Sequence, residues 1–212
     1  MQWHEAYDDA GSSLARRLVA VQRRLAQALD AALPGPVRLL SMCAGDGRDV
    51  TGVLGRHRRA RDVVGRLVEC DPILAGRARA RASELSLEAI EVVEDDAGRS
   101  DAYAGVVPAD VVLVCGVFGN VLAADVRSTV AELPHLCRMG ASVIWTRHRH
   151  PPDLTPSIRR WFADCGFAEV GFDTESPFSF AVGTNVMVGE PRPFRPGRRL
   201  FDFIGDGSGA HR

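Results

Sequence analysis

The chain of 212 residues contains no lysine, and all 26 of its basic residues are arginine. Lysine and arginine differ physically, but we attribute this absence to coding bias rather than to a mechanism. The chain also lacks an excess of either charge, since its formal net charge is −1. A nearly neutral chain offers no broad basic surface. We therefore expect neither nucleic acid nor a membrane as a partner.

Long hydrophobic runs and paired cysteines are absent as well. No apolar run approaches the roughly 20 residues that a membrane span needs, and the N-terminus lacks the basic-then-apolar pattern of a signal peptide. The five cysteines are scattered, and no CxxC pair occurs among them. This usage is typical of buried, reduced thiols rather than of a disulfide framework or a zinc site. We expect a cytoplasmic protein without a bound metal.

What the chain does contain is a regular alternation of apolar strands and amphipathic helices. The length suits one domain with a full core. Strands are expected at 37–42, 65–69, 89–93, 110–115, 141–146, 167–172 and 182–188. Helices are expected at 13–33, from Arg48 onward, and at 72–85, 124–137 and 156–165. The alternation predicts a doubly wound α/β sheet, mostly parallel, with helices on both faces.

The end of the predicted sheet departs from this pattern. The link between the last two strands is too short for a crossover helix, so the last strand should be antiparallel. Residues 1–36 are expected to form an N-terminal helical extension and 37–190 the main domain. Residues 191–212 are expected to form a tail that docks through Phe201 and Phe203.

A tight turn of small residues follows the first strand. It consists of Ala44, Gly45, Asp46 and Gly47, and a helix begins directly after it. Glycines let the backbone come close to a ligand, and the free N–H groups of a helix's first turn face an anionic group. The turn therefore predicts a nucleotide-like ligand.

Acidic residues follow the next two strands in order. Glu69 ends the second strand, where a carboxylate can accept two hydrogen bonds from a ribose diol. Asp96 and Ala97 follow the third strand, where a carboxylate can accept from an adenine amino group while a backbone N–H contacts the ring. The alternatives are that Glu69 pairs with an arginine and that Asp96 is an ordinary loop carboxylate.

With these residues in place, the chain resembles the class I S-adenosylmethionine-dependent methyltransferases over residues 37–190. The resemblance implies a Rossmann-like seven-stranded sheet and S-adenosylmethionine as cofactor. It assigns the glycine turn, Glu69 and Asp96-Ala97 to the cofactor, the last two to its ribose and adenine. The segments CAGDGRD, CGVFGN and WTRHR are similar to those of uncharacterised actinobacterial methyltransferase-like proteins.

In this family the ends of the fourth and fifth strands lie beside the transferable methyl group. Gly116 and Phe118 follow the fourth strand and are expected to contact the cofactor. Arg147 and His148 follow the fifth strand. His148 is a candidate general base, because imidazole changes protonation near neutral pH. Arg147, or Arg149 beside it, is a candidate clamp for an acceptor carboxylate or phosphate.

Tyr7 is the remaining catalytic candidate, because the family's N-terminal extension commonly folds over the cofactor. A small-molecule acceptor is expected, since the chain has no large inserted domain.

Two alternatives to the methyltransferase function stay open. One is a regulatory or catalytically silent cofactor-binding protein, because Ser41 and Cys43 stand where the family has an acid and its first glycine. The other is an NAD(P)-dependent oxidoreductase, although Val50 occupies the sixth position of a GxGxxG frame starting at Gly45.

Overall fold

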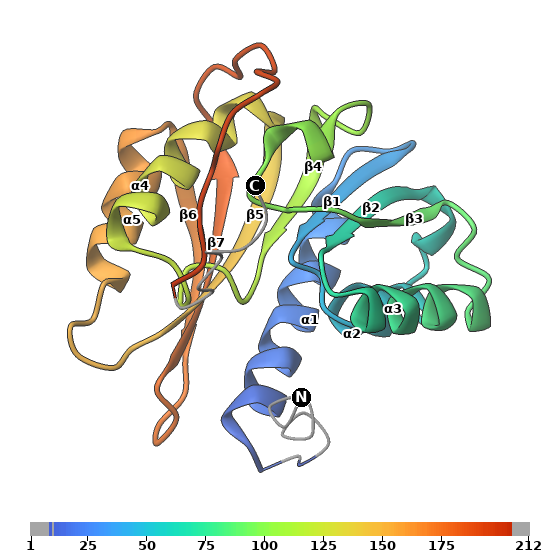
Figure 1. Ribbon diagram of the computed structural model, residues 1–212, viewed down its shortest axis with the longest axis horizontal. Coiled ribbons are helices and arrows are strands. Elements are labelled where there is room, and N and C mark those ends of the chain that lie inside the picture. Colours follow the sequence, from blue (N-terminus) through green and yellow to red (C-terminus); the bar gives the residue numbers. More distant parts are fainter. Residues whose placement is uncertain (1–8, 10, 205–212) are drawn as a thin grey trace.

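The computed structural model describes residues 9 and 11–204 (Figure 1). Its strands are β1 (Val37–Met42), β2 (Val63–Glu69), β3 (Ile90–Glu94), β4 (Ala109–Val114), β5 (Cys137–His148), β6 (Phe167–Thr174) and β7 (Phe180–Met187). Its α-helices are α1 (Ser13–Ala31), α2 (Arg48–Leu54), α3 (Pro72–Glu84), α4 (Ala123–Glu132) and α5 (Thr155–Asp164). Short 3-10 turns are η2 (Ala60–Asp62), η3 (Ser100–Tyr103) and η4 (Leu133–His135).

The strands form one seven-stranded sheet in the order β3-β2-β1-β4-β5-β7-β6. The pairs from β3 to β5 are parallel, and β7 runs antiparallel to both β5 and β6. The predicted α/β sheet with an antiparallel last strand is therefore confirmed. The chain order reverses at β1 and β4, and ligands of open α/β sheets bind beyond the strand ends at such a switch point.

Helices cover both faces of this sheet, so its central strands are buried on both sides (Figure 1). In β4, Val112 and Val114 pack in the core that α4 and α5 cover. Val111 and Leu113 point the other way, into the core that α1 and α2 cover. This alternation explains why β4 is a continuous apolar run, as expected of a central parallel strand.

The N-terminal helix α1 is part of the second of these cores. Ser12 caps it by accepting a hydrogen bond from the Ala15 N–H at 3.0 Å. Its buried residues include Leu25 and Leu29, which the 3.6-residue period places on one face. The helix ends at Ala31, a little before the predicted position 33.

The expected helix at 124–137 is too long. Helix α4 ends at Glu132, and Leu133–His135 form a 3-10 turn. Pro134 has no backbone N–H and cannot continue an α-helix without losing a hydrogen bond. Strand β5 therefore begins at Cys137, earlier than predicted, and its pairing with β4 contains a register shift between Ala109 and Val111.

The cysteines are free, but they are not uniformly buried. Cys137 is buried and Cys70 is exposed, whereas the other three are intermediate. The expectation of buried thiols is wrong for Cys70, because this residue lies just beyond the end of β2, where the chain leaves the sheet.

Residues 191–204 form a segment that we call the C-terminal strap. The Leu200 N–H donates to the Gly98 carbonyl at 2.8 Å, and the Ile204 N–H donates to the Asn120 carbonyl at 2.8 Å. The strap thus joins the loop after β3 to the loop after β4. Between β3 and β4 the described chain forms only the short 3-10 turn η3. Phe201 of the strap is 2% exposed and packs in the same core as the residues of η3. The predicted docking through Phe201 is confirmed.

Phe203 also takes part in docking the strap. It is partly buried against the same core, and its ring meets Phe201 edge-on with a centroid separation of 5.6 Å. The predicted docking through Phe203 is confirmed as well.

Gly183 in β7 lies against Trp145, the largest fully buried side chain of the described core. A Cβ added to Gly183 would lie 2.1 Å from Trp145 Cε2. The indole is held in place, because its Nε1 donates to Asn185 Oδ1 at 2.8 Å. We expect Gly183→Ala to lower the free energy of unfolding by about 3 kcal/mol, the upper end of ordinary overpacking costs. Denaturant unfolding measures this loss.

Gly76→Ala is the matched control for this prediction. Gly76 lies on the exposed side of α3, and an added Cβ would meet no heavy atom within 4 Å. This variant should gain up to about 1 kcal/mol of stability from helix propensity. Equal stability of the two variants would contradict the clash at Trp145.

Candidate cofactor site

The turn after β1 has the backbone conformation that glycine favours. Gly45 and Gly47 have φ angles of 58° and 71°. A Cβ on Gly47 would also lie 3.1 Å from Leu67 Cδ2 and 3.2 Å from Ala78 Cβ. Glycine at position 47 therefore meets two requirements, the left-handed φ and close packing against β2 and α3. The Ala44 N–H donates to the Val68 carbonyl at 2.9 Å and holds the turn beside the end of β2.

Cys43 also has a left-handed φ, of 50°, which is uncommon for a residue with a side chain. This is the position at which the sequence departs from the family's glycine. The backbone here thus keeps a glycine-like conformation although the residue is different.

Glu69 connects this turn to the start of α3. Its carboxylate accepts the Gly45 N–H at 2.7 Å through Oε2 and the Asp71 N–H at 2.9 Å through Oε1. Glu69 is only 7% exposed, and within the described part of the chain no arginine pairs with it. Oε1 also accepts the Cys70 thiol at 3.8 Å. A carboxylate has about four acceptor positions, so Oε2 keeps capacity for a diol hydroxyl and the weak thiol bond on Oε1 can be replaced by another. The arrangement suits the predicted ribose role.

The Asp46 side chain is buried and paired with two arginines. Its buried carboxylate pairs with Arg48 Nη2 at 2.6 Å and with Arg81 Nη2 of α3 at 3.3 Å. Burial acts to raise the pKa of Asp46, but the hydrogen bonds from Arg48 and the charges of both arginines outweigh it and hold the pKa below its usual value. The Asp46 side chain therefore fastens the turn to α3.

Asp96 and Ala97 lie just beyond the end of β3. Asp96 Oδ1 accepts the Gly98 N–H at 2.8 Å, and Oδ2 forms an ion pair with Arg199 of the C-terminal strap. The Asp96 side chain is 45% exposed, so a ligand can reach it. Ala97 is buried, and its carbonyl accepts the Tyr103 hydroxyl. No local pattern indicates Arg199 as a partner, because this residue lies 103 positions away in the chain.

The ends of β1, β2 and β3 converge around Cys43. Burial raises the pKa of its thiol well above the usual value, and the charges of Glu69, Cys70 and Asp96 act in the same direction. Both predicted carboxylates therefore lie close enough to the thiol to raise its pKa. The structure brings the glycine turn, Glu69 and Asp96 to one edge of the sheet, as the parallel strand order requires.

The loop after β4 is fastened by residues of β5. The Gly116 N–H donates to Thr146 Oγ1 at 3.0 Å, and the Asn120 side-chain amide donates to the Gly116 carbonyl at 2.6 Å. Arg147 donates to the Phe118 carbonyl. The segments CGVFGN and WTRHR are therefore in direct contact. A Cβ added to Gly116 would meet no described atom within 4 Å, so this position borders open space.

Phe118 directs its ring away from that space. The ring is fully buried, with its centroid 6.1 Å from that of Trp145. Its position leaves the backbone, rather than the ring, at the strand end where a cofactor contact is predicted.

His148 lies at the end of β5. Its ring stacks with that of His150 at a centroid distance of 5.4 Å. Its Nδ1 is buried and has no hydrogen-bond partner in the part of the chain that the structure describes. Burial, and then the charges of Arg147 and His150, lower the pKa of His148, while the neighbouring Gly119 backbone and Asp153 act in the opposite direction. A lowered pKa leaves the imidazole neutral at pH 7, the form that can accept a proton. Tyr7 lies outside the described residues.

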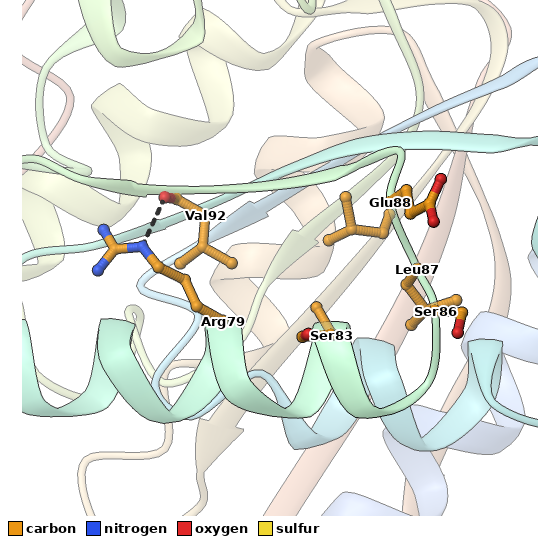
Figure 2. A pocket seen from close by; sticks show the side chains of 8 residues that line it. Arg79, Ser83, Ser86, Leu87, Glu88 and Val92 are labelled. Carbon is orange, nitrogen blue, oxygen red and sulfur yellow. Dashed lines mark hydrogen bonds between the residues drawn. The ribbon is translucent and has the colours of Figure 1, made fainter.

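A separate open cavity of about 340 Å³ lies between α3 and β3 (Figure 2). It is lined by Arg79, Ala82, Ser83, Ser86, Leu87, Glu88, Ile90 and Val92. Arg79 reaches across it to the Val92 carbonyl, with Nε donating at 3.3 Å. None of the predicted site residues lines this cavity, and we assign it no part in the cofactor site.

Among residues 9 and 11–204, no group of three or more His, Cys, Asp or Glu side chains is arranged to hold a metal ion. No helix in the same part of the chain has the length and apolar character needed to cross a bilayer.

The likeness of this protein to known proteins lies in its fold and not in its sequence. No family model and no curated protein matches the sequence. The seven-stranded sheet with antiparallel β7 is nevertheless the Rossmann-like fold of the class I S-adenosylmethionine-dependent methyltransferases.

Three solved structures illustrate this likeness. Magnesium protoporphyrin IX methyltransferase from Synechocystis PCC 6803 with bound S-adenosylhomocysteine is 15% identical, with a TM-score of 0.65 over 87% of this chain and 91% of that one. An RNA methyltransferase from Salinibacter ruber, also with S-adenosylhomocysteine, is 19% identical, with a TM-score of 0.54 over 86% and 97%. An O-methyltransferase family protein from Burkholderia thailandensis is 17% identical, with a TM-score of 0.57 over 93% and 64%. At these identities the likeness establishes the fold, and the similarity to an actinobacterial branch stays a prediction.

Proposed function

We propose that the protein is an S-adenosylmethionine-dependent methyltransferase that acts on a small-molecule acceptor. The observation that carries this proposal is the convergence of the glycine turn, Glu69 and Asp96 at one edge of the sheet. The proposal is supported by solved structures of the same fold, two of which carry S-adenosylhomocysteine and one S-adenosylmethionine.

Each cofactor residue has a distinct part in this proposal. The cofactor, when bound, supplies a methyl carbon that its sulfonium already activates. The protein's task is then to hold donor and acceptor at near-attack distance. Glu69 accepts from the ribose diol and Asp96 from the adenine amino group, while backbone groups of the turn at 44–47 lie against the cofactor. His148 accepts a proton where the acceptor's nucleophile must lose one.

The direct test is the affinity of Asp96→Ala for S-adenosylhomocysteine, measured by isothermal titration. Loss of one hydrogen-bond acceptor should weaken binding by about 1–3 kcal/mol, or about 5- to 150-fold. Asp202→Ala is the matched control, because it removes the other carboxylate partner of Arg199 and leaves Asp96 in place. An unchanged dissociation constant in a folded Asp96→Ala variant would remove Asp96 from the site.

A silent cofactor-binding protein is the second candidate. Ser41 stands where the family has an acid, and its buried hydroxyl has no hydrogen-bond partner among the described residues. Binding of S-adenosylhomocysteine without turnover of any compound in a broad acceptor panel would favour this candidate. Titration with NAD distinguishes the methyltransferase and the silent protein from an NAD(P)-dependent oxidoreductase. Absence of S-adenosylhomocysteine binding at high micromolar concentration would refute the methyltransferase proposal.

A further inference from the structure

Arg147 at the end of β5 has no carboxylate partner among residues 9 and 11–204. Its one described hydrogen bond is the donation to the Phe118 carbonyl. Its Nε is buried and has no hydrogen-bond partner within the same described ranges. A guanidinium has five N–H donors, so most of its capacity is unused. Burial lowers the pKa of Arg147, as expected of a cation that has lost water without gaining an acid.

The neighbouring arginines differ in this respect. Arg149, two residues further on, pairs with Asp153 at 3.1 Å, and Arg159 of α5 pairs with Glu169 at 2.6 Å. Asp153 acts on Arg147 only from a distance, since its oxygens already accept hydrogen bonds from Arg149 and Thr155. Of these three arginines, Arg147 is therefore the one whose guanidinium has no carboxylate partner among the described residues.

A partly buried cation with an unpaired donor is costly, so it points to a partner other than the residues that the structure describes. The position of Arg147 is informative as well. It contacts the loop at 116–120, beside Gly116, which borders open space. In the proposed function this end of β4 and β5 is where the acceptor meets the methyl group.

We propose that the acceptor carries an oxyanion, either a carboxylate or a phosphate, and that Arg147 binds it. The planar fork of the guanidinium matches the paired oxygens of both groups and can bind them bidentately. The role of this oxyanion as part of an acceptor rests on the proposed function. Binding of an anion at Arg147 can be measured without turnover.

The test follows the arginine Nε–H signals by NMR while inorganic phosphate, and separately acetate, is added. Arg147→Gln identifies the signal of Arg147 by its disappearance. We expect this signal to shift saturably with at least one of the two anions. A shift with acetate indicates a carboxylate on the acceptor, and a shift with inorganic phosphate indicates a phosphate. An Arg147 signal that neither anion moves would overturn the proposal.

Thermal stabilisation by the same anion provides the second readout. Arg147→Gln should weaken the apparent anion affinity at least about tenfold. Arg147→Lys keeps the cation and a donor for the Phe118 carbonyl but loses the fork, so its affinity should be intermediate. Arg149→Gln is the matched control and should respond like the wild type, because Asp153 already occupies that guanidinium. Equal responses of the wild type and both Arg147 variants would also overturn the proposal.

Titration with S-adenosylhomocysteine in parallel separates the two proposals. Anion binding at Arg147 without any S-adenosylhomocysteine binding would refute the methyltransferase function and leave the anion site standing. S-adenosylhomocysteine binding without an anion response at Arg147 would refute the anion site alone.

Discussion

Glu69→Gln is expected to weaken binding of S-adenosylhomocysteine by at least about 100-fold, which corresponds to about 3 kcal/mol. Both carboxylate oxygens of Glu69 accept backbone N–H groups, one from the glycine turn and one from the start of α3. Glutamine replaces one oxygen with an NH₂ donor, which then faces an N–H. Since hydrogen bonds to charged groups are worth about 1.5–3 kcal/mol each, the turn loses its anchor and the ribose loses an acceptor.

Isothermal titration measures this loss, and Glu91→Gln is the matched control. Glu91 lies on the neighbouring strand β3 and pairs with Arg66 on the exposed surface at 2.8 Å. Its substitution should leave the dissociation constant unchanged and the stability within about 0.5 kcal/mol. A dissociation constant of Glu69→Gln within about twofold of the wild type, a difference of about 0.4 kcal/mol, would contradict the assigned role.

Phe201→Ala is expected to lower the free energy of unfolding by about 3–5 kcal/mol, the usual cost of removing a buried phenylalanine. Phe201 fills the core between η3 and α4 and carries the strap that holds Arg199 against Asp96. The variant should therefore also bind S-adenosylhomocysteine more weakly than the wild type, because Asp96 loses a fixed position.

Denaturant unfolding provides the stability measurement, with Ile204→Ala as control. Ile204 belongs to the same strap but is 61% exposed. Its substitution should change stability by no more than about 0.5 kcal/mol. A loss of less than about 1 kcal/mol in Phe201→Ala would show that the strap does not depend on this ring.

The sheet could be predicted because each of its signals is local. The apolar run at 110–115 predicts a doubly buried strand, and β4 is such a strand. The short link at 173–181 predicts an antiparallel pair, and β6 and β7 form one. The strand ends then carry Glu69 and Asp96 to a common edge, because parallel strands end on the same side.

The predicted helix at 124–137 failed for a local reason, whereas the need for glycine at position 183 could not be predicted because it depends on a distant partner. The apolar periodicity of 124–137 continues past Glu132, but Pro134 interrupts the helix. Cys137 is then the first residue of strand β5. The need for glycine at position 183 comes from Trp145 on the adjacent strand. Nothing in the neighbourhood of Gly183 in the sequence indicates this contact.

The candidate cofactor site shows the same division. Periodicity, turn chemistry and strand ends were sufficient to place the glycine turn, Glu69 and Asp96, since these depend on residues near one another in the chain. Packing of distant segments accounts for the rest. It pairs Asp96 with Arg199 across 103 residues and turns the Asp46 side chain toward α3. It also leaves the Nε of Arg147 without a partner among the described residues. Such pairings arise only when the folded core brings the segments together, because no local pattern encodes which side chains will meet.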